Sequence, residues 1–463
     1  LFRSVDPMEK KAIYVVAIVA VLVAASVGVY AVVGNKDDVD SPASMEGAEL
    51  KVLGNANGDR VIDSKDIDVI EKAIDDGVAL KDAPLADANN DGVIDDKDIE
   101  VVKKIINKEP VTVWHINYHD VDGDSTMDME RVSTQYPVSA AIMTGSANSF
   151  IMCYMIGIID EIKGASYGSS NDSTLFGSTY LNTSKTVKLG TSSTSITFED
   201  GKAGSSNVIA EKGVTCVLSD WNRTYLTNES AFETAGVDVV RVAAASVDKE
   251  VYTHSILLLG FLFQKESRAS DLVDLYDSTM KTIKDAVSTL PEDKKVKAVA
   301  SSMNGYISSG NSDYQAVLDV AGAEFGLADY SGFGSSTSIK VVDHGSVFNT
   351  SLYDWDYIVH IRTALGYGTS AASAKTYWDT YTSAFNAWSH YGEEGSQIMI
   401  SGAAPVPVRV AYAAYAMYGS VLGELSESWA DGVHQTFITD FFNGDNTKLV
   451  ASDLLICCNS APA

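Results

Sequence analysis

The chain has 463 residues, enough for two or three domains. Its 62 acidic residues outnumber 34 basic ones and give a net charge of −28, which argues against a nucleic-acid partner because phosphates attract Lys and Arg. Four cysteines do not make a scaffold built on disulfides; we favour buried free thiols, with one disulfide as the alternative.

The first element is an apolar run without charged residues over 12–33. A helix of this length spans a bilayer core of about 30 Å. Lys10 and Lys11 precede the run and Asp37 follows it, so the positive-inside rule places the rest of the chain outside the cell. We favour an uncleaved anchor, with a cleaved signal peptide as the alternative. This predicts a single-pass cell-membrane protein whose bulk is extracellular.

An outward-facing chain is also open to N-glycosylation. Sequons at five asparagines predict a glycoprotein: Asn171, Asn182, Asn222, Asn228 and Asn349.

After an acidic linker over 34–49, one acidic pattern occurs twice, from Asn55 to Asp66 and from Asp87 to Asp98. Oxygen-bearing side chains recur at loop positions 1, 3, 5, 9 and 12, and position 7 offers a backbone carbonyl, which is how a short loop surrounds Ca²⁺. Mg²⁺ fits less well because it keeps its waters, and simple Asp/Asn/Gly turns are the alternative. We therefore predict two Ca²⁺ sites, with these ligands: Asn55, Asn57, Asp59, Val61, Asp63, Asp66, Asp87, Asn89, Asp91, Val93, Asp95 and Asp98.

Position 6 separates the two copies. It is Gly92 in the second loop but Arg60 in the first, where a sharp bend favours glycine. We therefore expect the first loop to bind Ca²⁺ more weakly.

Each loop is followed by apolar residues at helical spacing, such as Ile67, Ile70 and Ile74 after the first. A loop with Asp at position 12 and one helix after it, repeated once, resembles a type I dockerin over roughly Leu50 to Lys108. The resemblance implies a small all-α, Ca²⁺-folded module over 50–109 that docks onto a cohesin-bearing protein.

Residues 110–130 are predicted to form an acidic linker. It contains a third acidic run, from Asp120 to Asp128, in which position 12 is Arg131. An arginine cannot ligate a cation, so we favour a linker turn, with a weak Ca²⁺ site as the alternative.

The remainder alternates short apolar strands with helices, which indicates α/β layers. Strands are predicted at 138–143, 214–218, 237–242, 296–301 and 357–361, and helices at 149–159 and 251–263. A long amphipathic helix over 267–290 precedes Pro291. The expected fold is therefore two α/β lobes, 131–266 and 291–463, joined by one helix.

Four stretches in this order resemble the class III substrate-binding proteins of ABC importers for siderophores, cobalamin and haem. They are residues 237–269, 320–329, 353–359 and 405–416. The resemblance implies that a metal chelate or tetrapyrrole binds in a cleft between the lobes and passes to an ABC permease. The family's permease-docking Glu is missing near 347–356, and only Glu199 is a loose candidate in the first lobe. A surface interaction protein tethered to a cohesin partner, without transport, is therefore the alternative.

Ligands of such folds bind beyond the carboxyl ends of strands. Aromatic side chains there can stack on a flat chelate, and arginines can pair with carboxylates. A core-capping aromatic, an arginine paired within the chain and a buried histidine are the structural alternatives. The predicted ligand-binding residues are Trp221, Arg223, Tyr225, Met303, Tyr306, His360 and Arg362.

Catalytic motifs do not stand out. The sequence shows no Ser/His/Asp order, P-loop or Gly-rich dinucleotide turn. We therefore predict a binding protein rather than an enzyme.

Overall fold

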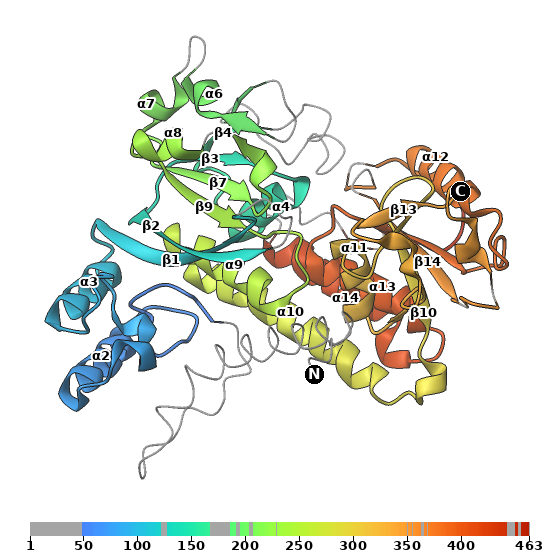
Figure 1. Ribbon diagram of the computed structural model, residues 1–463, viewed down its shortest axis with the longest axis horizontal. Helices are drawn as coiled ribbons and strands as arrows, with labels where there is room; N and C mark the ends of the chain where they lie inside the picture. Colours follow the sequence, from blue (N-terminus) through green and yellow to red (C-terminus); the bar gives the residue numbers. More distant parts are fainter. Residues whose placement is uncertain are drawn as a thin grey trace, which may run out of the picture. The chain divides into compact units, whose positions relative to one another are not determined.

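The computed structural model describes residues 49–121, 127–166, 186–190, 195–202, 207–227, 229–349, 351–353, 355–362, 365–367, 369–441, 450–451 and 455–462. The chain divides into two compact units, 1–116 and 117–463 (Figure 1). The apolar run 12–33 and the linker 34–49, except for residue 49, lie outside the described residues. In the part that is described, no helix is both long and apolar enough to cross a membrane.

The first unit is built from two helices, each of which directly follows an acidic loop. They are α2 (Ser64–Asp76) and α3 (Asp96–Ile106), separated by the short 3-10 helices η1 (Leu80–Asp82) and η2 (Pro84–Ala86). Their apolar stripes pack together around Ile70, Ile99 and Val102. The predicted helical spacing is therefore confirmed, because the side chains that recur every three or four residues form the core of this unit.

Residues near the end of the first unit are hydrogen-bonded to residues near its beginning. Val52 forms an antiparallel bridge with His115, and the Leu53 amide donates to the Trp114 carbonyl at 2.8 Å. Residues 110–130, expected to be a linker, instead contain strand β1 (Val111–His119) and the start of β2 (Asp128–Tyr136). The alternation of buried and half-buried residues in β1 is typical of a strand.

In the second unit, the first lobe holds a five-stranded sheet in the order β5-β4-β3-β7-β9. All of its strand pairs are parallel, and β3 and β7 pair from Ala141 with Cys216 to Thr144 with Ser219. The elements of this lobe are β3 (Ala141–Thr144), α4 (Ala147–Ile156), β4 (Ile162–Ala165), β5 (Val187–Lys188), β6 (Ile196–Thr197), α6 (Phe198–Lys202), α7 (Val208–Lys212), β7 (Cys216–Asp220), β8 (Leu226–Thr227), α8 (Glu229–Thr234) and β9 (Asp238–Val242).

Two consecutive helices lead from this sheet to the next lobe. Helix α9 (Lys249–Leu262) is buried along most of its length, whereas α10 (Glu266–Val287) buries one face. At Gly260 an added Cβ would lie 2.3 Å from the Ala269 Cβ, so only glycine permits this close crossing of the two helices. The predicted long helix is confirmed, although it ends at Val287, before the predicted limit at 290.

Helix α10 contacts elements of both lobes. It packs on α4 of the first lobe and on α13 (Val406–Tyr418) of the second (Figure 1). Its Arg268 donates from Nε to the Met155 carbonyl in α4 and from Nη2 to the Phe441 carbonyl near the C-terminus, both at 2.6 Å. The Arg268 side chain thus connects helix α10 to both lobes by hydrogen bonds.

The second lobe repeats the α/β layering. Its sheet has the order β12-β10-β14-β15-β16, in which only β16 is antiparallel. Trp355 and Trp388 stack in its core with ring centroids 4.5 Å apart. The elements are β10 (Lys297–Ser301), β11 (Tyr306–Ser308), α11 (Asp313–Val320), β12 (Glu324–Phe325), β13 (Ser338–Lys340), β14 (Tyr357–Arg362), α12 (Ala371–Thr382), β15 (Gln397–Ser401), α13, α14 (Glu427–Thr436), a π-helical turn (Phe437–Phe441) and β16 (Cys457–Cys458).

Candidate functional site

Polar residues at the end of β7 and in the first turns of α4, α11 and α13 lie where the two lobes meet. We call Asn148, Asp220, Asp313, Tyr314 and Arg409 the interlobe junction. Arg409, in the first turns of α13, donates from Nη2 to the Asn148 Oδ1 at 2.8 Å. Asn148 lies in the first turn of α4, so this bond joins the helix after β15 to the helix after β3.

Asp220 ends β7 and is the most buried acid of the junction, with 3% of its surface exposed. Its Oδ2 accepts hydrogen bonds from the Ser146 Oγ at 2.9 Å and the Ser149 Oγ at 2.8 Å. Burial raises the pKa of this carboxyl, while the two serine hydroxyls oppose the rise. At Gly145, where φ is +143°, an added Cβ would lie 2.8 Å from the Ser149 Oγ, so glycine makes room for this arrangement.

Arg409 is buried in the second lobe and already holds two carbonyls there. Its Nη2 donates to the Gly402 and Ala404 oxygens at 2.9 and 3.0 Å, besides Asn148. Its Nε is buried without a hydrogen-bond partner in the described structure. Burial lowers the pKa of the guanidinium, and the nearby Asp313 opposes this effect. The junction therefore contains a buried guanidinium whose Nε has no hydrogen-bond partner in the described structure.

The pKa values of Asp313 and Tyr225 are each shifted in part by groups of the other lobe. Protein surrounding Asp313 raises the pKa of its carboxyl, Asp220 of the other lobe adds to the rise, and Arg409 opposes it. Burial raises the pKa of Tyr225, with further contributions from Asp220 and from Tyr314 of the second lobe. The interlobe junction together with Tyr225 thus comprises two carboxyls, two phenols and one guanidinium.

Of the residues predicted in the first lobe, Tyr225 reaches the junction. Its backbone carbonyl accepts from the Thr144 Oγ1 at 2.8 Å, which holds the 3-10 turn Arg223–Tyr225 against the end of β3. Trp221 is half-buried directly after β7, and Arg223 is exposed. Both follow the carboxyl end of a strand, as predicted.

Of the ligand-binding residues predicted in the second lobe, some lie at the surface and one lies in the core. Met303 is 46% exposed, and Tyr306 is half-buried at the start of β11. Arg362 ends β14, where its guanidinium lies over the Tyr381 ring at 4.1 Å and its Nε is buried without a hydrogen-bond partner in the described structure.

His360, in contrast, is completely buried within β14. Its Nε2 lies 3.1 Å from the Gln397 Oε1, and burial lowers its pKa to about 4. The structure therefore places this residue in the core as a neutral histidine and not at a ligand-facing surface.

The sequence interpretation did not assign ligand contact to Asn148, Asp313, Tyr314 or Arg409. Each lies in the first turns of a helix that begins shortly after a strand. Extending the strand-end rule to the opening turn of the next helix would have found them.

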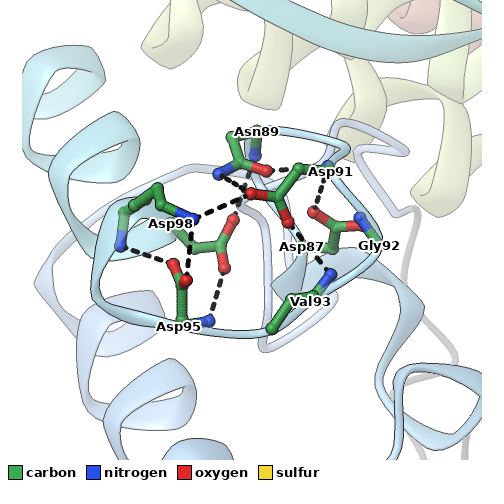
Figure 2. Close-up of polar contacts among 8 residues, drawn as sticks. Asp87, Asn89, Asp91, Gly92, Val93, Asp95 and Asp98 are labelled. Carbon is green, nitrogen blue, oxygen red and sulfur yellow. Dashed lines mark hydrogen bonds and ion pairs between the residues drawn. The ribbon is translucent and has the colours of Figure 1, made fainter.

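The two acidic loops of the first unit form a second candidate site. In the loop from Asp87 to Asp98, Asp98 accepts from the amides of Asn89 at 3.1 Å and Asp95 at 2.8 Å (Figure 2). The first loop repeats both bonds through Asp66, which accepts from the amides of Asn57 and Asp63. Both position-12 carboxylates are buried, and burial raises the pKa of Asp66 to about 6.

The loops differ at positions 1 and 6. Asp87 accepts from the amides of Asp91 and Gly92, both at 3.0 Å, and Gly92 has φ +89°. In the first loop Asn55 instead turns its Nδ2 inward to the carbonyls of Leu50 and Asp59, at 2.7 and 2.8 Å. This leaves its Oδ1 buried without a hydrogen-bond partner in the described structure.

These observations fit a cation. A buried, unpaired amide oxygen and a buried carboxylate are both costly unless a positive partner approaches them. Within the described ranges, however, no group of three or more His, Cys, Asp and Glu side chains is arranged to hold a metal ion. A site in these loops would therefore depend on asparagine oxygens and the carbonyls of Val61 and Val93 as well as on the carboxylates.

Several predictions fall wholly or partly outside the described residues. The run from Asp120 to Asp128 includes 122–126, and the sequons at Asn171, Asn182 and Asn228 are not described. Asn222 is half-buried and Asn349 is exposed.

Comparisons with known proteins agree with this architecture. A family model described as "Periplasmic binding protein" matches residues 215–359. The TroA-like periplasmic binding protein FepB of Veillonella parvula is 16% identical, with 68% of this chain and 94% of that chain covered and a TM-score of 0.52. A periplasmic haem-binding protein of Pseudomonas aeruginosa is 13% identical, with 61% and 93% covered and a TM-score of 0.43. No curated protein matches the sequence. The second unit therefore has the two-lobed α/β fold of periplasmic binding proteins.

Proposed function

We propose that the second unit is the solute-binding protein of an ABC importer and captures a metal chelate, either an iron-siderophore, cobalamin or a haem-like tetrapyrrole. The matched family model and the shared fold support a binding protein and give no support to an enzyme. The chelate class itself rests on the sequence resemblance.

The observation that carries the proposal is the interlobe junction. Parallel strands of both lobes end next to helices that meet through Arg409 and Asn148, and carboxyl ends of parallel strands are where α/β folds bind ligands. Tyr225 of the first lobe and Tyr314 of the second, both half-buried, also follow strand ends. Phenols can stack on or hydrogen-bond to a chelate, and the unpaired Arg409 Nε–H can donate a hydrogen bond to its oxygen atoms.

Titration of tryptophan fluorescence with ferric siderophores, haem and cobalamin tests the proposal. Trp221 follows β7 and is only half-buried, so a ligand bound beside Asp220 should change its emission. We expect one of the three probes to bind at micromolar concentration. No response to any of them would contradict the proposal and favour the interaction protein tethered to a cohesin partner.

A pair of matched variants locates the site. Asp313→Asn changes the charge at the junction, whereas Asp293→Asn makes the same change in the turn before β10, at the opposite end of the sheet. We expect only the first variant to alter affinity for the probe that binds. Equal effects would show that the ligand binds elsewhere.

We further propose that the first unit binds two Ca²⁺ ions and is a dockerin-like module. Its support is the repetition of the same carboxylate-to-amide bonds in both loops, together with the buried, unpaired Asn55 Oδ1. The oxygens of Asn55, Asn57, Asp59, Asp63 and Asp66, with the corresponding residues of the second loop, would hold the ions. Bound Ca²⁺ would offset the mutual repulsion of the carboxylates.

Calorimetric titration of the purified full-length chain with Ca²⁺ tests this second proposal. Two binding events are expected, the weaker one in the first loop because of Arg60. A flat titration in millimolar Ca²⁺ would contradict it. Attachment to the membrane through residues 12–33, glycosylation, docking to a permease and docking to a cohesin-bearing partner stay proposals that follow from the sequence.

A further inference from the structure

Lys97 distinguishes the second acidic loop from the first. Its Nζ lies 3.1 Å from the Asp91 Oδ2 and 2.9 Å from the Asp95 Oδ2. These carboxylates occupy positions 5 and 9 of the loop, where Ca²⁺ would draw on their oxygens. One ammonium group therefore bridges two of the predicted ligands.

The first loop offers an internal comparison, because it also has a lysine at position 11. Lys65 lies 3.5 Å from the Asp63 Oδ2 at position 9, and this contact is longer than either contact of Lys97. Apart from position 1 and the lysine contacts, the side-chain hydrogen bonds at positions 3, 5, 9 and 12 are the same in the two loops. In each loop the position-3 asparagine donates from Nδ2 to the position-5 carboxylate at 3.1 Å. The lysine bridge is therefore a feature of the second loop that its repeated pattern does not require.

The electrostatics of the bridge explain why it forms. Four of the predicted ligands in this short loop are carboxylates, those of Asp87, Asp91, Asp95 and Asp98, and like charges at this spacing repel. The Lys97 ammonium donates hydrogen bonds to the carboxylates of both Asp91 and Asp95. The single positive charge of the Lys97 ammonium thus replaces part of the charge that a divalent ion would bring to the loop.

We propose that Lys97 is an internal counter-ion of the second loop, which holds Asp91 and Asp95 together without a divalent ion and leaves them when Ca²⁺ binds. This inference rests on the calcium proposal above. It has two consequences with opposite signs. Lys97 stabilises the folded loop in chelator, and it weakens Ca²⁺ binding because the ion must displace it.

The size of the effect follows from the exposure of the groups. The Lys97 side chain is 64% exposed, and those of Asp91 and Asp95 are 37% and 36% exposed. Exposed ion pairs are weak, so each contact changes an equilibrium constant by at most about fivefold. Loss of both contacts should tighten Ca²⁺ binding by about three- to tenfold.

The test compares Lys97→Met with Lys65→Met in the full-length chain. Both variants remove one positive charge from the same position of a loop, and both lysines are exposed, so neither substitution disturbs the core. Hydrogen–deuterium exchange of residues 55–66 and 87–98, followed across a Ca²⁺ titration, gives the affinity of each loop separately.

We expect Lys97→Met to lower the Ca²⁺ midpoint of residues 87–98 about three- to tenfold and to speed their exchange in chelator. Lys65→Met should shift the midpoint of residues 55–66 less than about twofold, and Lys97→Arg should resemble the wild type. Equal midpoint shifts in the two methionine variants would overturn the counter-ion proposal, because a general change in net charge would explain them. If the wild-type chain shows no Ca²⁺ response in either segment, the calcium proposal fails and this one falls with it.

Discussion

Replacing Asp98 with alanine should unfold the second loop and helix α3, because this one carboxylate closes the loop and caps the helix. It accepts from the Asn89 amide at 3.1 Å and from the Asp95 amide at 2.8 Å, and it is fully buried. Alanine would leave both amides unsatisfied and remove half of the capping box at the start of α3.

The magnitude follows from these bonds. A hydrogen bond to a charged group contributes about 1.5–3 kcal/mol. Burial raises the pKa of Asp98, so the cost of burying its charge offsets part of that gain. We estimate a net loss of about 2–4 kcal/mol, a large fraction of the stability of so small a unit.

Hydrogen–deuterium exchange of residues 96–106, in chelator and in Ca²⁺, measures the effect. Asp96→Ala is the matched control because Asp96 is exposed in the first turn of the same helix and the charge change is equal. We expect α3 to lose protection in Asp98→Ala under both conditions and to keep it in Asp96→Ala. Equal protection in the two variants would refute the reasoning.

Three further predictions concern the second unit. The folded-state pKa of His360 is about 4, below the unfolded value of about 6.5. The wild type should therefore lose stability as the pH falls through this window, by about 2 kcal/mol at pH 5. Urea unfolding of His360→Gln should show a smaller loss of stability between pH 7 and pH 5. Arg409→Met removes three hydrogen bonds, including the one to Asn148, and should lower the free energy of unfolding by about 2–4 kcal/mol, more than Asn148→Ala does. Trp388→Ala removes the ring stacked on Trp355 and should cost about 3–5 kcal/mol in urea unfolding, whereas no change would show that the core refills.

Local patterns in the sequence predicted much of the fold. The five strands and two shorter helices predicted in the lobes are present within a few residues, since runs such as Val237–Val242 are apolar enough to be buried on both faces of a parallel sheet. The long helix α10 was also predicted, because apolar residues at helical spacing mark its buried face. The stretch 110–130 was wrongly predicted to be a linker, because β1 alternates polar and apolar residues and an acidic run separates it from its partner strand β2.

In the candidate sites, the acidic loops could be predicted from the sequence, whereas the lysine bridge could not. The acidic loops were found because the ligands of a loop are close in sequence, so their spacing is visible without a structure. The lysine bridge was not found, since Lys65 and Lys97 occupy equivalent positions and only the coordinates separate a 3.5 Å contact with one carboxylate from a bridge between two.

By itself, the sequence determined which segments are strands, helices and acidic loops, because these depend on the chemistry and spacing of neighbouring residues. The tertiary structure decided which strand-end residues meet across the lobes. Arg409 and Asn148 are 261 residues apart and form a 2.8 Å hydrogen bond, whereas His360, at the end of a predicted strand, is enclosed by the core. Burial and contact between distant segments depend on how the layers pack, and no local spacing records that.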